Sequence, residues 1–404
     1  MKSTSQRGLW GAAAVFGLAS AEVLIMASPF AGLFYSTIRF EPFLGLFSQS
    51  PLTAWLDGFF LQHSVVTSSV LLEWQRKLGT CLFGLGLWGF FISAFQVYGN
   101  KLTKRGVAKG LLYRFVRHPQ YLCLGLAGLG LLTIWPRFLL LGIWTTMLFL
   151  YSGLARFEEY RMEERFGEDY RDLTETRGIF LPGSPVHGLF EKTFGRIQPR
   201  LLGWAAAYLL CLILVFSGGF VLRAYTRAST AILFQPERQM VVVSAWPQPQ
   251  EWMERVLEIA LADREIQQWV QESQADKPVV VTILPPRYEM KAMFYKVSPE
   301  QPWNSFSRWM GLFSRALIPP SGLTFWDPIM GVDPDSTNEP VQLVFSQAEK
   351  AYKKDLALEE ALDASVRLKP LVVVDVVAST GEISEILVPL PQNRWGPNVV
   401  MPLL

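Results

Sequence analysis

Long apolar runs separated by short charged clusters dominate the first 226 residues. Residues 78–97 form one such run, and residues 122–155 form a longer one whose single charge is Arg137. About 20 apolar residues in a helix cross the ~30 Å hydrocarbon core of a bilayer, so the longer run suffices for two spanning helices joined at Trp135 and Pro136. A further run at residues 201–222 predicts a last span.

Two earlier segments add to this pattern. Residues 9–29 follow a short basic stretch and are too long for a typical cleaved signal, so we interpret them as a membrane anchor. Residues 55–72 could span if Asp57 and His63 lay at interfaces or inside the bundle, or they could lie flat on the membrane. The pattern therefore predicts an α-helical membrane bundle of about 5 to 6 spans.

The pattern changes after residue 227. Short apolar runs typical of strands alternate with longer amphipathic runs typical of helices. Thr380 and Gly381 separate two of the short runs and predict a hairpin turn. This order of elements favours an extramembrane α+β domain with a mostly antiparallel sheet. The predicted strands are 240–245, 278–284, 341–346, 371–378 and 383–390, and the predicted helices are 251–272 and 347–368.

These changes divide the chain into four parts. Residues 1–76 hold the N-terminal membrane segments, residues 77–200 hold the hairpin with its charged clusters, residues 201–226 form the last transmembrane helix, and residues 227–404 form the α+β domain.

Basic residues set the expected orientation. Lys101, Lys104, Arg105 and Lys109 follow the 78–97 run with no acidic residue among them, and short loops of this kind stay cytoplasmic. The hairpin returns to the same side, and one more crossing carries residues 227–404 to the other. We expect a multi-pass membrane protein whose C-terminal domain is periplasmic or otherwise extracytoplasmic.

Composition agrees with this class. Hydrophobic residues make up 50% of the 404 and charged residues 18%, below the ~25% of a soluble domain. The net charge of +2 does not favour a nucleic-acid partner. The three cysteines, Cys81, Cys123 and Cys211, lie in apolar runs without metal-ligand spacing, so no metal site is predicted.

Two charged clusters flank the hairpin. The first reads GLLYRFVRHPQY at residues 110–121, and the second reads RFEEYRMEERFGEDY at residues 156–170. A helical hairpin brings its two ends back to one membrane face, so the clusters should meet there. Glu158 and Glu159 lie along the apolar stripe of the second cluster, which favours a cation opposite them. Alternatively, this cluster is an interfacial amphipathic helix with Glu/Arg pairs for solubility.

Taken together, the two clusters resemble the isoprenylcysteine carboxyl methyltransferases and their phospholipid N-methyltransferase relatives, over about residues 77–182. These are integral-membrane enzymes that use S-adenosylmethionine. Met162 stands where the family has Leu, and Cys123 stands where many members have Gly, which could narrow access to the cofactor. The matching positions are Gly110, Tyr113, Val116, Arg117, His118, Pro119, Tyr121, Glu158, Glu159, Phe166, Gly167 and Tyr170.

The resemblance implies a set of site residues. His118 and Arg117 are expected to be catalytic, and the cofactor-binding set joins Pro119, Tyr121, Glu158 and Glu159 to these two.

Each of these residues also has a structural interpretation. Arg117 could anchor a helix end to lipid phosphates, Pro119 could start a helix, Tyr121 could belong to an interfacial aromatic belt, and His118 could be a structural residue of the bundle.

The function implied by the resemblance is S-adenosylmethionine-dependent methyl transfer to a lipophilic acceptor at the cytoplasmic face. The acceptor could be an isoprenylcysteine-like carboxylate, a lipid amine or a thiol, and it could reach the site between the 78–97 helix and the hairpin. The alternative is an inactive membrane anchor whose C-terminal domain binds a protein partner. The intact Arg117-His118-Pro119 and Glu158-Glu159 stretches argue against that alternative.

Overall fold

The structure is a computed structural model. It describes residues 24–34, 47–62, 65, 67–103, 106–181, 185–273, 277–285 and 340–388. The chain forms two compact units. One comprises residues 1–38, 81–132 and 142–215, and the other comprises residues 39–80, 133–141 and 216–404. His63 and most of the 9–29 segment lie outside the described residues.

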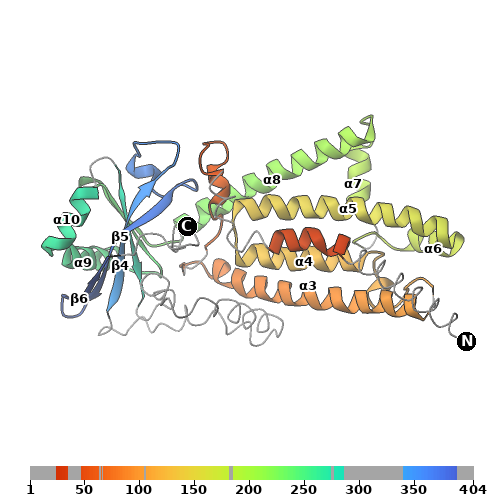
Figure 1. Cartoon of the computed structure of the whole chain (residues 1–404), viewed down its shortest axis with the longest axis horizontal. Coiled ribbons are helices and arrows are strands. Elements are labelled where there is room, and N and C mark those ends of the chain that lie inside the picture. The colour runs from red at the N-terminus through yellow and green to blue at the C-terminus, as the bar shows by residue number, and fades with distance from the viewer. Residues whose placement is uncertain are drawn as a thin grey trace, which may run out of the picture. The chain divides into compact units, whose positions relative to one another are not determined.

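Helices account for the apolar part of the described chain (Figure 1). Three of them, α3, α5 and α8, are long and apolar enough to cross a membrane by length and composition. Two apolar helices are shorter, Leu24–Phe34 and α4, so among the described residues fewer spans stand out than the sequence predicted. The helices are α3 (Val70–Leu102), α4 (Pro119–Ile134), α5 (Phe138–Phe166), α6 (Glu168–Thr176), α7 (Pro185–Phe194) and α8 (Arg200–Ala228).

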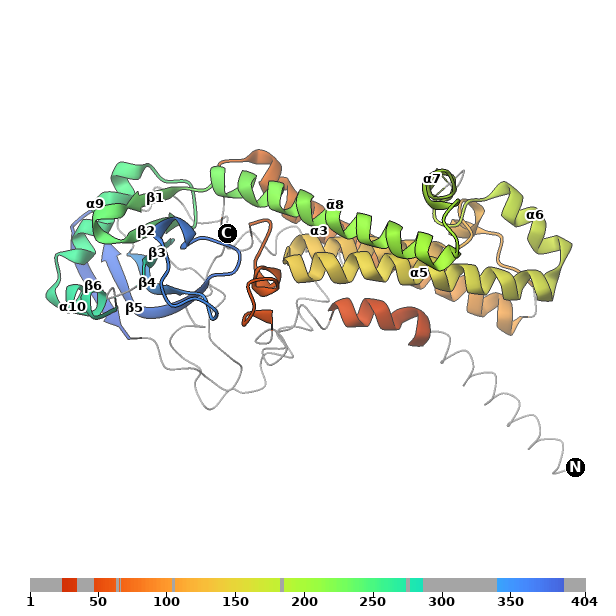
Figure 2. The same ribbon diagram turned by 90° about the horizontal axis from the view of Figure 1, so that it is seen from above.

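The predicted hairpin is confirmed as α4 and α5 joined by a tight turn. Pro136 has no backbone N–H and cannot continue α4, and the Arg137 amide donates to the Trp135 carbonyl at 2.8 Å. In the first unit α3, α4 and α5 run alongside one another in both views (Figure 1, Figure 2). The two ends of the hairpin therefore lie at the same end of the helix pair.

Glycines bring α3 and α4 into backbone contact. A Cβ on Gly86 would lie 2.4 Å from the Ala127 nitrogen and 2.6 Å from the Cys123 carbonyl oxygen. A Cβ on Gly89 would lie 2.6 Å from the Cys123 sulfur. The helices are therefore closely packed at the middle of the seam through which we expected an acceptor to pass.

A spanning helix over residues 55–72 is wrong. The described residues there form a short 3-10 helix, η1 (Ala54–Asp57), followed by irregular chain up to α3. Beyond the 3-10 helix, part of this backbone bonds to the hairpin turn. The Phe60 amide donates to the Pro136 carbonyl at 2.8 Å, and the Phe138 amide donates to the Gly58 carbonyl at 3.0 Å.

The C-terminal part forms a six-stranded sheet in the order β1-β2-β3-β4-β5-β6. Strands β2 and β3 pair in parallel and every other neighbouring pair is antiparallel, so the mostly antiparallel sheet is confirmed. The strands are β1 (Ile232–Gln235), β2 (Met240–Ser244), β3 (Val279–Leu284), β4 (Val341–Glu349), β5 (Arg367–Val377) and β6 (Glu382–Leu387).

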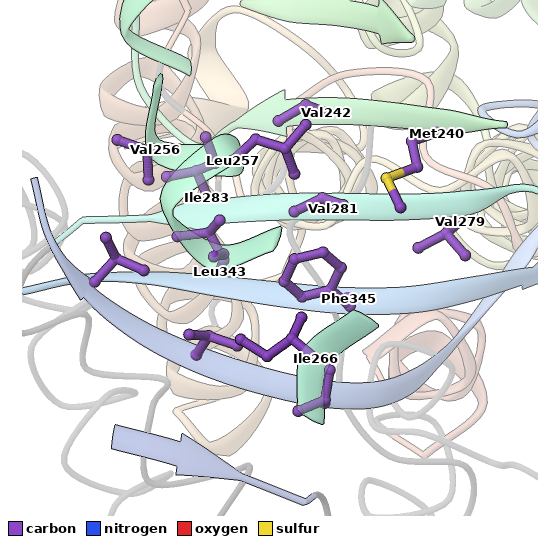
Figure 3. Close-up of a cluster of buried hydrophobic side chains, with 14 of the residues drawn as sticks. Met240, Val242, Val256, Leu257, Ile266, Val279, Val281, Ile283, Leu343 and Phe345 are labelled. Atoms are coloured by element: carbon purple, nitrogen blue, oxygen red, sulfur yellow. The ribbon is translucent and has the colours of Figure 1, made fainter. Parts of the chain in front are cut away.

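Two helices pack on one face of the sheet. Parallel neighbours need a crossover, which α9 (Gln250–Leu261) and α10 (Arg264–Ser273) supply between β2 and β3. Alternate strand residues meet these helices in a core that includes Val281, Phe345 and Leu257 (Figure 3). The single predicted helix 251–272 is thus two helices. Asp263 starts the second one, because its side chain accepts the Glu265 amide at 2.8 Å.

The predicted helix 347–368 is wrong. Residues 347–349 continue β4, paired with β5, and a loop with the short 3-10 helix η4 (Leu358–Glu360) follows. Ion pairs satisfy the charges that suggested a helix, since Lys350 contacts Asp363 at 2.8 Å and Lys353 contacts Glu360 at 2.6 Å. Strand β1 was not predicted, because its four residues are too few to show a period.

Candidate functional site

The first charged cluster is fixed by a distant piece of backbone. Val116 and Gly178 form a parallel bridge. The Arg117 amide donates to the Gly178 carbonyl at 3.0 Å, and the His118 amide donates to the Ile179 carbonyl at 3.1 Å. We call residues 177–180 the strap. It sets the position of Arg117 and His118 before α4 begins at Pro119.

Side chains also attach the strap to the first charged cluster. The Arg177 guanidinium donates to the Tyr113 carbonyl at 2.5 Å. The Phe180 ring meets the His118 ring edge-on, with centroids 6.4 Å apart. The first charged cluster and the strap therefore pack against each other, although about 60 residues of sequence separate them.

Arg117 and His118 both contact the carboxylates of α5. Arg117 Nε lies 2.8 Å from Glu159 Oε1, and its Nη1 donates to the Thr174 carbonyl at 3.0 Å. His118 Nε2 lies 3.3 Å from the same Glu159 oxygen, and Nδ1 lies 3.5 Å from Glu158 Oε2. One imidazole thus lies between two carboxylates, one of which also contacts the guanidinium.

Tyr121 connects this group to the interior of the hairpin. Its hydroxyl donates to Glu158 Oε1 at 2.5 Å. Its ring lies 4.9 Å from the Tyr151 ring and stacks at 5.8 Å on the His118 ring. Because Tyr121 is almost fully buried, it holds the more exposed carboxylate, Glu158, towards the protein.

The electrostatics favour a charged histidine. Burial opposes the charged form of His118, but the interactions of its ring with the Glu158 and Glu159 carboxylates outweigh burial and raise the His118 pKa. Burial and the nearby Glu158 raise the pKa of Tyr113, and burial and Glu159 raise that of Tyr170, so both phenols stay neutral. Arg117 and His118 thus face the two carboxylates, and these carboxylates favour the charged form of the imidazole.

Some hydrogen-bonding capacity in this group is unused. Arg117 Nε, His118 Nε2 and Glu159 Oε1 are buried and within ion-pair distance of one another, yet none of the three makes a hydrogen bond of acceptable geometry. The distances between these atoms suit ion pairs, but the groups are not aligned for hydrogen bonds, which weaken steeply when bent.

Several structural interpretations can now be excluded. Arg117 is buried against Glu159 and Thr174, so it does not reach out to lipid phosphates. Tyr121 is buried and not part of an interfacial belt. The second charged cluster is not a separate interfacial helix, because α5 continues through it to Phe166. Pro119 does occupy the first turn of α4, as its structural interpretation held.

The predicted residues Arg117, His118, Pro119, Tyr121, Glu158 and Glu159 are thus brought together, and their functional roles stay predictions. Tyr151 and the strap were missed. Tyr151 lies within an apolar run, where its hydroxyl gave no signal, and the strap bonds through backbone atoms that any sequence supplies. Among the described residues, no group of three or more metal-ligating side chains is present.

In comparisons with family models, curated proteins and solved structures, nothing matches this chain. The resemblance to the methyltransferases therefore stays a prediction from the two charged clusters.

Proposed function

We propose that the protein is an integral-membrane methyltransferase that uses S-adenosylmethionine to methylate a lipophilic acceptor. The observation that carries the proposal is the convergence of Arg117, His118 and Tyr121 with Glu158 and Glu159. These residues come from the two ends of one hairpin. Buried charged groups are costly unless they are paired or bind a ligand.

The charged groups of the candidate site suit this cofactor. S-adenosylmethionine carries a positive sulfur, a positive amine and a negative carboxylate. Glu158 and Glu159 offer negative charge to the first two, and Arg117 with the charged His118 offers positive charge to the third. The buried atoms without aligned partners, among them His118 Nε2 and Glu159 Oε1, can turn to such a ligand without losing a good hydrogen bond.

The bound cofactor would supply an electrophilic methyl group. The protein's own residues then have to orient the reactants and exclude water. Tyr121 holds Glu158, the strap holds Arg117 and His118, and the phenols of Tyr113 and Tyr170 remain neutral neighbours. A carboxylate or thiolate acceptor needs no base, and a protonated His118 would not act as one.

The proposal includes a membrane topology. We infer five spans, with α4 as the short arm of the hairpin and an N-terminal anchor before α3. Large apolar side chains are exposed along α3 and α8, among them Phe95, Leu85 and Ile213, as expected of helices that face lipid. The site would face the cytoplasm, and the sheet domain would lie on the extracytoplasmic side.

The alternative is a membrane anchor without activity that presents the sheet domain to a protein partner. Calorimetry of the purified protein with S-adenosylmethionine separates the two. Binding that is lost in the double variant Glu158→Gln/Glu159→Gln supports the enzyme, and absence of binding by the wild type favours the anchor. Radiolabelled methyl transfer to extracted membrane lipids and thiols would then identify the acceptor class.

A further inference from the structure

Residues 54–60 lie between the hairpin turn and the sheet domain, and we call them the joint. They belong to the same compact unit as residues 133–141 and 216–404. Ala54 and Phe59 are almost fully buried, although the segment has little secondary structure. An irregular segment with this burial is held by its neighbours.

On the hairpin side, the joint is held by ring packing and by backbone. The Trp55 ring lies 5.4 Å from Phe138, 5.0 Å from Phe216 and 5.3 Å from Phe220. Phe59 forms an antiparallel bridge with Arg137, and the Arg137 guanidinium lies 4.8 Å from the Phe59 ring. The joint is therefore part of the packing of the hairpin turn and of the end of α8.

On the domain side, the same few residues meet the loop before β5. Asp57 places one carboxylate oxygen 2.9 Å from Arg137 and the other 3.6 Å from Arg367 of β5. Arg223 of α8 is buried and donates to two carbonyls, that of Phe59 in the joint and that of Leu362 in the loop. One carboxylate and one guanidinium thus each join the hairpin region to the sheet domain.

Gly58 shows how tight the fit is. Its φ of −70° is open to any residue, so the backbone does not require glycine. A Cβ at this position would lie 2.5 Å from the Ala364 carbonyl oxygen and 2.7 Å from the Ala364 Cβ. Only the approach of the domain loop demands a glycine here.

From these contacts we propose that the joint makes the sheet domain a fixed anchor of the hairpin turn, so that a displacement of the domain moves the turn. The joint can transmit a displacement because it is closely packed on both sides. Its two backbone bonds to the turn, Phe60 to Pro136 and Phe138 to Gly58, lie directly beside the contact with Ala364. A partner that shifts the sheet domain would therefore reach the hairpin. This inference does not depend on methyl transfer.

The test perturbs the domain and observes the hairpin. Hydrogen exchange of the Phe60 and Phe138 amides is measured by mass spectrometry on the full chain in lipid nanodiscs, for wild type and Ala364→Leu. The larger side chain crowds the close approach of Ala364 to Gly58. We expect exchange at both amides to rise roughly tenfold or more, because both bonds report opening of the joint. Unchanged exchange would overturn the proposal.

Two further variants keep the result interpretable. Arg367→Ala removes a half-exposed contact to Asp57 and should raise exchange at the same amides by a few-fold. Arg238→Ala removes an exposed pair with Glu258 elsewhere in the domain and should leave them unchanged. If amides of β4 show that Ala364→Leu has unfolded the sheet, Arg367→Ala decides, and wild-type exchange in that variant refutes the coupling.

Discussion

At the residue scale, the candidate site depends on few side chains with several contacts each. Glu159 contacts both Arg117 and His118 and is the more buried of the two carboxylates, with 15% of its side chain exposed against 46% for Glu158. Loss of its charge should therefore affect a bound cation more than loss of any exposed carboxylate.

The first prediction concerns this carboxylate. Glu159→Gln should weaken S-adenosylmethionine binding at least about tenfold, which corresponds to ~1.4 kcal/mol. Glu164→Gln, on the same helix but exposed, is the matched control and should bind like the wild type. Calorimetry on both measures the difference. Equal affinity in the two variants would remove Glu159 from the cofactor site.

The second prediction uses the raised pKa of His118. A group whose folded pKa lies above its unfolded value, about 6.5 for histidine, stabilises the protein fully below the unfolded pKa. That contribution is lost as pH rises through the folded pKa. His118→Gln should thus be destabilised at pH 6, by on the order of 1–3 kcal/mol, and the gap should shrink towards pH 9.

Melting temperatures of wild type and His118→Gln across this pH range provide the measurement. The charged groups facing His118 are Glu158 and Glu159 of α5, with Arg117 beside it and the neutral Tyr121 stacked on it. A gap that stays constant with pH would mean that the imidazole is not charged by these carboxylates.

Sequence alone could identify much of this group but not its geometry. Arg117, His118 and the two glutamates were identified because their order on the two sides of the hairpin resembles the methyltransferase pattern. The position of His118 between both carboxylates also depends on the strap, which has no local sequence pattern. Tyr151 could not be identified from the sequence, since a buried phenol in an apolar helix looks like any core aromatic residue.

At the element scale, the periodic helices were predictable and the irregular segments were not. The turn at Pro136, the span that became α3 and the sheet strands follow from apolar runs and from proline and glycine signals. The spanning alternative for residues 55–72 and the helix over residues 347–368 are wrong because part of each backbone bonds elsewhere, at Gly58 and Phe60 to the hairpin turn and at residues 347–349 to β5. Tertiary hydrogen bonds overrode the local pattern in both.

The third prediction tests the seam between α3 and α4. Gly86→Ala places a Cβ against backbone atoms of Ala127 and Cys123, so the helices must separate, at a cost of about 1–3 kcal/mol. Gly99→Ala on the same helix has open space and should be neutral or slightly stabilising. Thermal unfolding in detergent compares the two, and similar melting temperatures would contradict the close contact.

At the scale of the whole molecule, the division of the chain into an apolar helical part and a sheet domain was visible in composition alone. The number of spans was not, because length and hydropathy do not tell whether a marginal segment finds other partners. The described residues contain three long apolar helices and two shorter ones, Leu24–Phe34 and α4. The sidedness of the sheet domain rests on counting these helices.

The fourth prediction tests that count. With Cys81, Cys123 and Cys211 replaced by serine, single cysteines are introduced as Lys101→Cys at the end of α3 and Glu359→Cys in the exposed loop of the sheet domain. In the proposed topology, three crossings, α4, α5 and α8, separate the two positions. An impermeant thiol reagent on sealed vesicles should label them from opposite sides, and labelling from the same side would refute the proposed topology.

The strap also bears on the order in which the protein is made. Arg117 and His118 leave the ribosome long before Gly178 and Ile179, whose carbonyls accept their amide protons. Both helices of the hairpin are synthesised in between, so for that interval the charged segment must find other partners at the membrane surface, such as water or lipid headgroups. A nascent chain that stops short of residue 178 has the hairpin but leaves these amides without their final acceptors. Completion of the candidate site is therefore a late event in biosynthesis, after the helices that carry it have been synthesised.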